Sequence, residues 1–259
     1  MPLGFAPGDI VALVRDARRG DDDPPPILVT GVRASELARL LAEGGDSGLV
    51  RTNGDPGHAA AVVHVAAGAI DAAGAAGLRT ATRFGVPTLA VQTAVTTERL
   101  PYVLPSDVVA AWGQSEFPME AIAGALAAAL RNEASVFAGR LPVLRLPAVK
   151  RRIFEASLSA AVLAGLRGDK SARLPVLSLL QARMLRDLDG VRGVPAPATP
   201  QETAITVGPE LVAAVAVGFA GRTLVRALPW RSPVADGAVA FAGTLLLGKV
   251  GPRLRERLT

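Results

Sequence analysis

The sequence predicts an α/β fold with a mostly parallel sheet, helices on both faces of that sheet, and a separate all-α domain after it. Strand and helix patterns alternate from Ile27 to Leu130, as in a doubly wound parallel sheet. Strand patterns are absent beyond Ser135, where apolar helical segments follow. The expected parts are an N-terminal helix with an acidic, proline-rich linker (residues 1–25), an α/β domain (26–134) and a helical domain (135–259).

The composition is compatible with two domains and restricts the chemistry of the chain. Half of the 259 residues are hydrophobic, so the chain can bury a sizeable core. The absence of cysteine excludes a disulfide framework and a thiolate metal site. A net charge of +5 permits contact with phosphates without requiring it. No secretory signal is visible at the N-terminus, so we expect a cytoplasmic location.

The stretch from Pro26 to Glu43 predicts a strand, a turn and a helix. The β-branched run Ile27–Thr30 is followed by Gly31 and then by a helical pattern of leucines. A phosphate-binding loop at this turn requires a second glycine followed by Lys-Ser or Lys-Thr. The chain has Val32-Arg33-Ala34-Ser35-Glu36 instead, and a carboxylate at Glu36 repels an anionic ligand. We expect an NTPase-like shape without phosphate-binding chemistry.

The remaining elements of the first domain follow from short apolar runs and helix-ending signals. Gly85, with Pro87 just beyond it, is typical of the end of a helix. An apolar run without alternation is typical of a buried parallel strand. The predicted elements are strands Leu49–Arg51, Ala59–Val65, Thr88–Gln92 and Val108–Ala111, and helices Asp71–Phe84 and Met119–Leu130.

Four helices are predicted in the second domain. The last two are apolar almost all round, which places a helix either at the centre of a bundle or in lipid. Small residues four apart, such as Ala240 and Thr244, let such helices approach closely in either setting. No window reaches the roughly 18 to 20 apolar residues of a membrane span. The predicted ranges are Val149–Leu166, a helix after Pro175 that runs through Leu188, Gly208–Leu228 and Val234–Val250.

Two groups of motifs resemble the bacterial Era-like GTPases, in which a helical domain shared with the YcjF-like inner-membrane proteins follows the GTPase domain. In the second half the matching residues are Leu179–Leu185, Arg222–Pro229 and Gly237–Thr244 with Gly248. In the first half, Asp55-Pro56-Gly57 stands at the place of the Asp-x-Pro-Gly switch of these enzymes. The run Gly85–Thr93 occupies the strand that ordinarily ends in Asn-Lys-x-Asp.

The resemblance implies a nucleotide site whose contacts have been lost. Gln92-Thr93 replaces Asn-Lys, and no aspartate follows to read guanine. No lysine precedes Lys150, so the lysines that contact phosphate and base are absent from this domain. We expect no nucleotide cofactor, no metal and no catalysis, and we interpret His58 and His64 as structural. The degenerate nucleotide positions are Gly31, Arg33, Ser35, Asp55, Gly57 and Gln92.

A basic cluster lies between the two domains and is the candidate contact with a membrane or partner. A basic segment beside apolar helices can hold an anionic lipid surface at about 1 kcal/mol per residue. The alternative is a solvated face paired with acids such as Glu133 and Glu155. Few aromatic residues are interleaved with the cluster, so nucleic acid is disfavoured. The cluster comprises Arg140, Arg145, Lys150, Arg151 and Arg152.

The hypothesis favoured by these patterns is a non-catalytic, pseudo-GTPase-like scaffold or adaptor, peripheral or integral at the inner membrane. The alternative is a degenerate nucleotide- or phosphate-binding protein with residual GTPase-like activity, in which Arg33 and Arg51 replace lysine. A third interpretation makes the apolar helices an interface for self-association.

Overall fold

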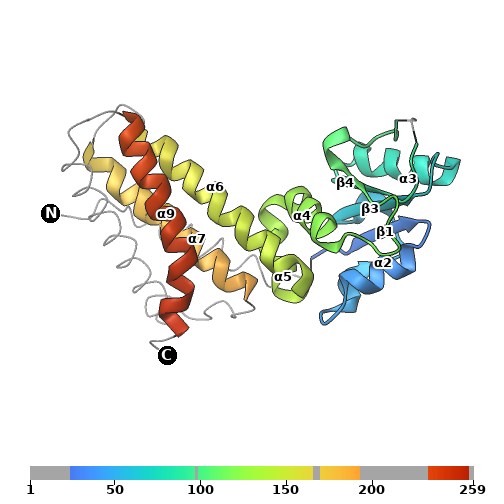
Figure 1. Cartoon of the computed structure of the whole chain (residues 1–259), viewed down its shortest axis with the longest axis horizontal. Coiled ribbons are helices and arrows are strands. Elements are labelled where there is room, and N and C mark those ends of the chain that lie inside the picture. The colour runs from blue at the N-terminus through green and yellow to red at the C-terminus, as the bar shows by residue number, and fades with distance from the viewer. Residues whose placement is uncertain (1–23, 97–98, 166–169, 193–232, 257–259) are drawn as a thin grey trace. The chain divides into compact units, whose positions relative to one another are not determined.

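The computed structural model describes residues 24–96, 99–165, 170–192 and 233–256 (Figure 1). The predicted helix near the N-terminus and the predicted helix Gly208–Leu228 lie outside these residues. The chain divides into two compact units, an α/β unit (Asp23–Ala148) and a helical unit whose described residues begin at Val149.

Five parallel strands form the sheet of the α/β unit, which confirms the predicted α/β fold. The order across the sheet is β2-β1-β3-β4-β5, and every neighbouring pair is parallel. Most of their positions were expected, because short apolar runs between turn residues identify buried strands. The bounds are β1 Ile27–Gly31, β2 Val50–Arg51, β3 Ala61–Ala66, β4 Thr88–Gln92 and β5 Val108–Ala110.

Helices cover both faces of this sheet, as predicted (Figure 1). Helices α2 (Ala34–Leu41) and α4 (Met119–Leu130) contact each other on one face, and α3 (Ala72–Arg83) lies on the other. Asp71 caps the start of α3, and Gly85 at φ 71° follows its end. The core under α3 contains Leu28, Ala59, Val62, Leu78 and Ala81.

The connection from β4 to β5 covers part of the sheet without an α-helix in its described residues, and it ends in a 3-10 turn, Pro105–Asp107. Leu100 packs against Ala66 and Ala90, and Val103 packs against the same cluster and the core under α3. These contacts place the connection on the α3 side of the sheet. The connection therefore returns along that face to the amino edge, where β5 begins.

The α/β unit extends beyond residue 134, where the sequence placed the end of the first domain. Helix α5 (Ala134–Arg140), which was not predicted, is followed by a short 3-10 turn, Pro142–Leu144. Phe137, Leu141 and Leu144 are fully buried, because their spacing directs all three toward the core. The division of the chain therefore falls between Ala148 and Val149.

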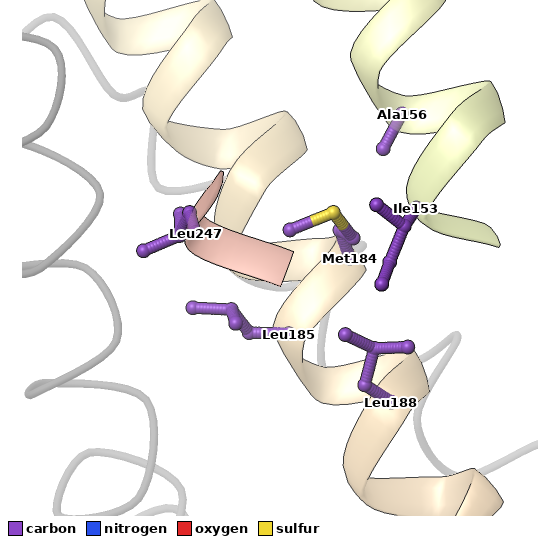
Figure 2. Packing of buried hydrophobic residues seen from close by; sticks show 6 residues of the cluster. All are labelled: Ile153, Ala156, Met184, Leu185, Leu188 and Leu247. Carbon is purple, nitrogen blue, oxygen red and sulfur yellow. The ribbon is translucent and has the colours of Figure 1, made fainter. Parts of the chain in front are cut away.

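Three helices account for nearly all the described residues of the helical unit. Helix α6 (Arg145–Gly165) begins before the predicted Val149, because Pro147 lies in its first turn, where proline is tolerated. Helix α7 (Lys170–Val191) likewise begins before Pro175 and includes it. The third is α9 (Pro233–Glu256). Figure 2 shows the core that they share: Ile153, Ala156, Met184, Leu185, Leu188 and Leu247.

Small residues let α9 approach α6 closely. A Cβ atom on Gly237 would lie 3.0 Å from the Ala161 carbonyl oxygen, and one on Gly248 would lie 2.7 Å from the Ile153 side chain. The order of these contacts shows that the two helices are antiparallel. Thr244 is buried and accepts a hydrogen bond of 2.9 Å from Gln181 Nε2 on α7. Among the described helices, none has the length and apolar character needed to span a bilayer.

The buried position of Phe137 predicts a large cost for its truncation. Phe137→Ala should lower the free energy of unfolding of the α/β unit by about 3 to 5 kcal/mol, because it leaves a cavity in the core. Phe84→Ala is the matched control, since Phe84 is 61% exposed, and should cost less than about 1 kcal/mol. Urea unfolding followed by Trp112 fluorescence in a Trp230→Phe background measures both. Equal costs would contradict the assignment of α5 to this unit.

Candidate functional site

The turn after β1 lies at the topological switch point of the sheet, where doubly wound α/β proteins bind ligands. The chain leaves β1 for β2 on one side and later returns to β3 on the other, so a crevice is expected between the carboxyl ends of β1 and β3. In this protein the turn is tied to β3 by a 3.0 Å hydrogen bond from the Val32 N–H to the Val65 carbonyl. Gly31, at φ 89°, lies so close to Val65 that a Cβ atom would collide with its carbonyl oxygen. The crevice is closed at this point by the chain itself.

Arg33 occupies the place where a phosphate would approach the start of α2. It is the N-cap residue, in a left-handed conformation with φ 54°. Its guanidinium makes two 2.7 Å hydrogen bonds to the Glu36 carboxylate and one of 3.1 Å to the Ser115 carbonyl. It also lies 4.5 Å from the centre of the Phe117 ring. The hydrogen bond from Arg33 lowers the pKa of Glu36, which keeps this carboxylate charged.

The other sequence-predicted positions at this edge offer little to a ligand. Ser35 is exposed on the first turn of α2. Gln92 is buried at the end of β4, and its carbonyl accepts a 2.7 Å hydrogen bond from the Ala111 N–H. Thr93 binds the Ala66 carbonyl through both its N–H and its hydroxyl. The Gln92 carbonyl and the Thr93 hydroxyl are therefore used to join neighbouring parts of the sheet.

Asp55 and Gly57 are not brought to the turn after β1. They belong to the 3-10 turn Pro56–His58 and its cap, which precede β3 and pack against the C-terminal end of α3. A Cβ atom on Gly57 would lie 2.8 Å from the Phe84 ring. Because α3 runs from the carboxyl edge of the sheet back to its amino edge, Asp55 and Gly57 lie at the edge opposite to Gly31. The predicted nucleotide positions therefore do not form one site.

Each oxygen of the Asp55 carboxylate is bonded within its own turn. The carboxylate accepts hydrogen bonds from the Gly57 N–H at 2.9 Å and from His58 Nδ1 at 2.7 Å. The Gly57 N–H, followed by the His58 contact, lowers the pKa of Asp55. This arrangement fixes the turn before β3.

His64 is a buried structural residue, as the sequence indicated. Its Nδ1 lies 3.0 Å from the Thr30 hydroxyl on the neighbouring strand. Burial lowers the pKa of His64, and the charge of Asp71 only partly opposes that shift. Among the described residues, no three acidic or histidine side chains are grouped as a metal site would require.

The basic cluster is divided between the two units and engaged in intramolecular contacts. In the α/β unit, Arg140 lies 3.9 Å from Asp46, and Arg145 donates to the Ala138 and Gly139 carbonyls at the end of α5. In the helical unit, Arg151 pairs with Glu155 at 2.7 Å and Arg152 pairs with Asp187. Lys150 is exposed. Arg145, Arg151 and Arg152 are thus bonded within their own units, and Arg140 lies close to Asp46.

The contacts of Arg33 and Arg152 were not expected from the sequence. The Ser115 carbonyl that Arg33 reaches is 82 residues away along the chain. Asp187, the partner of Arg152, is partly buried, and its burial raises its pKa although Arg152 opposes the shift. No local pattern in the sequence signals either partner.

The fold and the site define a class: an α/β protein with a five-stranded parallel sheet whose switch-point turn is closed by its own side chains. Comparison of the chain with protein-family models, curated proteins and solved structures gives no match. The assignment of a role therefore rests on the geometry described above.

The depressed pKa of His64 predicts that stability falls in mild acid. The unfolded chain, with an ordinary histidine pKa of about 6.5, binds a proton at a higher pH than the folded chain does. The free energy of unfolding should therefore be fully maintained above about pH 6.5 and decline as the pH is lowered toward 5. His64→Gln should reduce this slope. Urea titrations at several pH values measure the slope, and an unaltered slope in His64→Gln would refute the assignment.

The closure of the turn predicts different costs for alanine at two glycines of this edge. Gly31 and Gly68 both have positive φ, but a Cβ atom on Gly68 meets nothing within 4 Å. Gly68→Ala should cost about 1 kcal/mol through backbone strain alone. Gly31→Ala should cost about 3 kcal/mol or more, because overpacking against Val65 is added. Comparable urea midpoints for the two variants would show that the turn is not closed on β3.

Proposed function

We propose that this chain is a non-catalytic scaffold or adaptor whose α/β unit is pseudo-GTPase-like. The observation that carries the proposal is the set of contacts made by Arg33, which binds Glu36, the Ser115 carbonyl and the Phe117 ring. This arginine and its carboxylate partner fill the start of α2, where a phosphate would bind. The strand order β2-β1-β3-β4-β5 is also that of a common doubly wound arrangement that hosts many unrelated functions.

The separation of the predicted nucleotide positions supports the same proposal. Asp55 and Gly57 belong to the amino edge of the sheet, whereas Gly31, Arg33 and Gln92 belong to its carboxyl edge. A GTPase needs its phosphate-binding turn and its switch at the same edge of the sheet, so that both reach one nucleotide. The residues that resemble these motifs contribute to folding instead, which suits a protein that acts by binding other proteins.

The intramolecular bonds of the basic cluster favour a protein partner over a lipid surface in this proposal. Arg145, Arg151 and Arg152 each bind a carbonyl or carboxylate of the same unit. Transfer of such a side chain to a lipid headgroup would break a contact within the fold. A scaffold role needs no such exchange.

Titration calorimetry with GTP, GDP and ATP, each with Mg²⁺, tests the proposal. We expect no binding heat, which corresponds to a Kd of about 1 mM or weaker. Binding in the micromolar range would overturn the proposal in favour of the phosphate-binding alternative. In that case Arg33→Ala and Arg51→Ala should abolish the heat, and the control Arg39→Ala, at an exposed position of α2, should retain it.

A further inference from the structure

Exposed apolar side chains gather with arginines at the amino edge of the sheet. Phe84, at the end of α3, is 61% exposed, and Tyr102 and Leu104, in the connection from β4 to β5, are 45% and 65% exposed. Arg79 and Arg83 are exposed one helical turn apart on α3. We call these five residues the arginine–aromatic surface. It lies at the edge opposite to the closed turn after β1.

Contacts between the two segments make this surface continuous. The Tyr102 carbonyl accepts a hydrogen bond of 3.0 Å from the Thr88 hydroxyl at the start of β4. The Thr82 hydroxyl, which donates to the Leu78 carbonyl at 2.9 Å, lies 3.5 Å from the same Tyr102 oxygen. The Arg79 guanidinium lies 5.8 Å from the centre of the Tyr102 ring. The end of α3 and the connection therefore hold one another in place and present their side chains together.

The backbone of Tyr102 is strained, and the neighbouring packing maintains the strain. Its φ of 65° lies in the left-handed region, which costs about 1 kcal/mol or more for a residue with a Cβ atom. Val103, the next residue, packs into the core under α3, and Leu100 is buried just before it. Strained backbone conformations of this kind cluster at functional sites. Here the strained residue is an exposed tyrosine.

The two arginines of this surface are not paired with carboxylates in the part of the chain that the structure describes. Among those residues, neither Arg79 nor Arg83 forms an ion pair. The Asp55 carboxylate at the same edge is bound by His58 and the Gly57 N–H, and the Asp107 carboxylate accepts a hydrogen bond from the Ser106 hydroxyl. Aromatic residues and arginines are enriched among the residues that dominate protein interfaces.

We propose that the arginine–aromatic surface binds an acidic peptide segment of a partner protein. In this interaction Phe84, Tyr102 and Leu104 contact an apolar side chain of the segment, and Arg79 and Arg83 pair with its carboxylates. A second copy of the same surface would bring like charges together, which is unfavourable. Leu104, the most exposed of the three apolar residues, provides no ring on which a base could stack, so a peptide is favoured over single-stranded nucleic acid.

This inference goes beyond the proposed function and does not depend on it. A scaffold must have at least one docking surface, but the arginine–aromatic surface would be available whether or not a nucleotide binds at the other edge. Calorimetry with nucleotides and the peptide experiment below can therefore fail separately.

The test uses the full chain and a library of short random peptides displayed on phage. Selection on the unmodified protein, with removal of phage that bind the Arg79→Glu/Arg83→Glu variant, should enrich sequences with several Asp or Glu residues around an apolar residue. Fluorescence anisotropy of the most enriched peptide should show at least about tenfold weaker binding to this double variant and to Tyr102→Ala. Binding should also weaken as salt is raised.

Two matched variants serve as controls. Arg39→Glu makes the same change of charge as the single variant Arg83→Glu, at an exposed position of α2 on the other face of the sheet. Trp112→Ala removes an aromatic residue that is 45% exposed, as Tyr102 is, but follows β5 at the carboxyl edge. Both should retain binding within about twofold, and unchanged urea midpoints should show that every variant is folded.

Three outcomes would overturn the inference. The first is a selection that enriches no sequence, or enriches basic ones. The second is an equal loss of binding in Arg39→Glu and in Arg83→Glu, which change the net charge equally, and this would indicate a response to net charge. The third is tighter binding of an oligouridylate probe with the same dependence on Arg79 and Tyr102, which would assign the surface to single-stranded nucleic acid.

Discussion

The parallel pairing of β1 with β3 is the interaction on which the α/β unit depends. All five residues of β1 pair with β3, from Ile27 opposite Ala61 to Gly31 opposite Val65. Every residue of β3 is buried, because helices or the long connection cover both faces of the sheet at its centre. The same pairing brings the turn after β1 against Val65 and places Thr30 beside His64. The pairing of β1 with β3 thus also closes the turn after β1.

A closed turn of this kind changes the role of the edge at which related architectures bind ligands. In doubly wound proteins the switch point is open because glycines keep side chains away from the ligand. Here Gly31 is required for close packing of the chain on itself, and Arg33 contacts Glu36, the Ser115 carbonyl and the Phe117 ring. The opposite edge instead has exposed aromatic and basic side chains and a strained residue, Tyr102, whose carbonyl accepts a hydrogen bond from the Thr88 hydroxyl. The α/β unit thus has one edge closed by its own side chains and one edge with exposed aromatic residues and arginines.

The sequence predicted the positions of the strands well, but it did not predict which loops the sheet brings together. Short apolar runs such as Thr88–Gln92 identified buried strands because few other structures tolerate them. Helix α5 was missed because the prolines and arginines that follow it obscured the spacing of Phe137, Leu141 and Leu144. The order of motifs along the chain suggested that Asp55 and Gly31 belong to one site. Order does not determine which edge of a sheet a loop reaches, and β2, with only two residues, ends before the chain could bring Asp55 to that site.

The buried hydrogen bond between Gln181 and Thr244 restricts how α9 can slide along α7. A shift of α9 by one turn would replace Thr244 with Ala240 or Gly248 opposite Gln181, leaving a buried amide without its partner. The same shift would move Gly248 away from Ile153 and force a larger side chain into that space. Helices that pack through small and apolar residues alone ordinarily tolerate several registers. Here the hydrogen bond between Gln181 and Thr244 and the close contact at Gly248 together favour one register of α9.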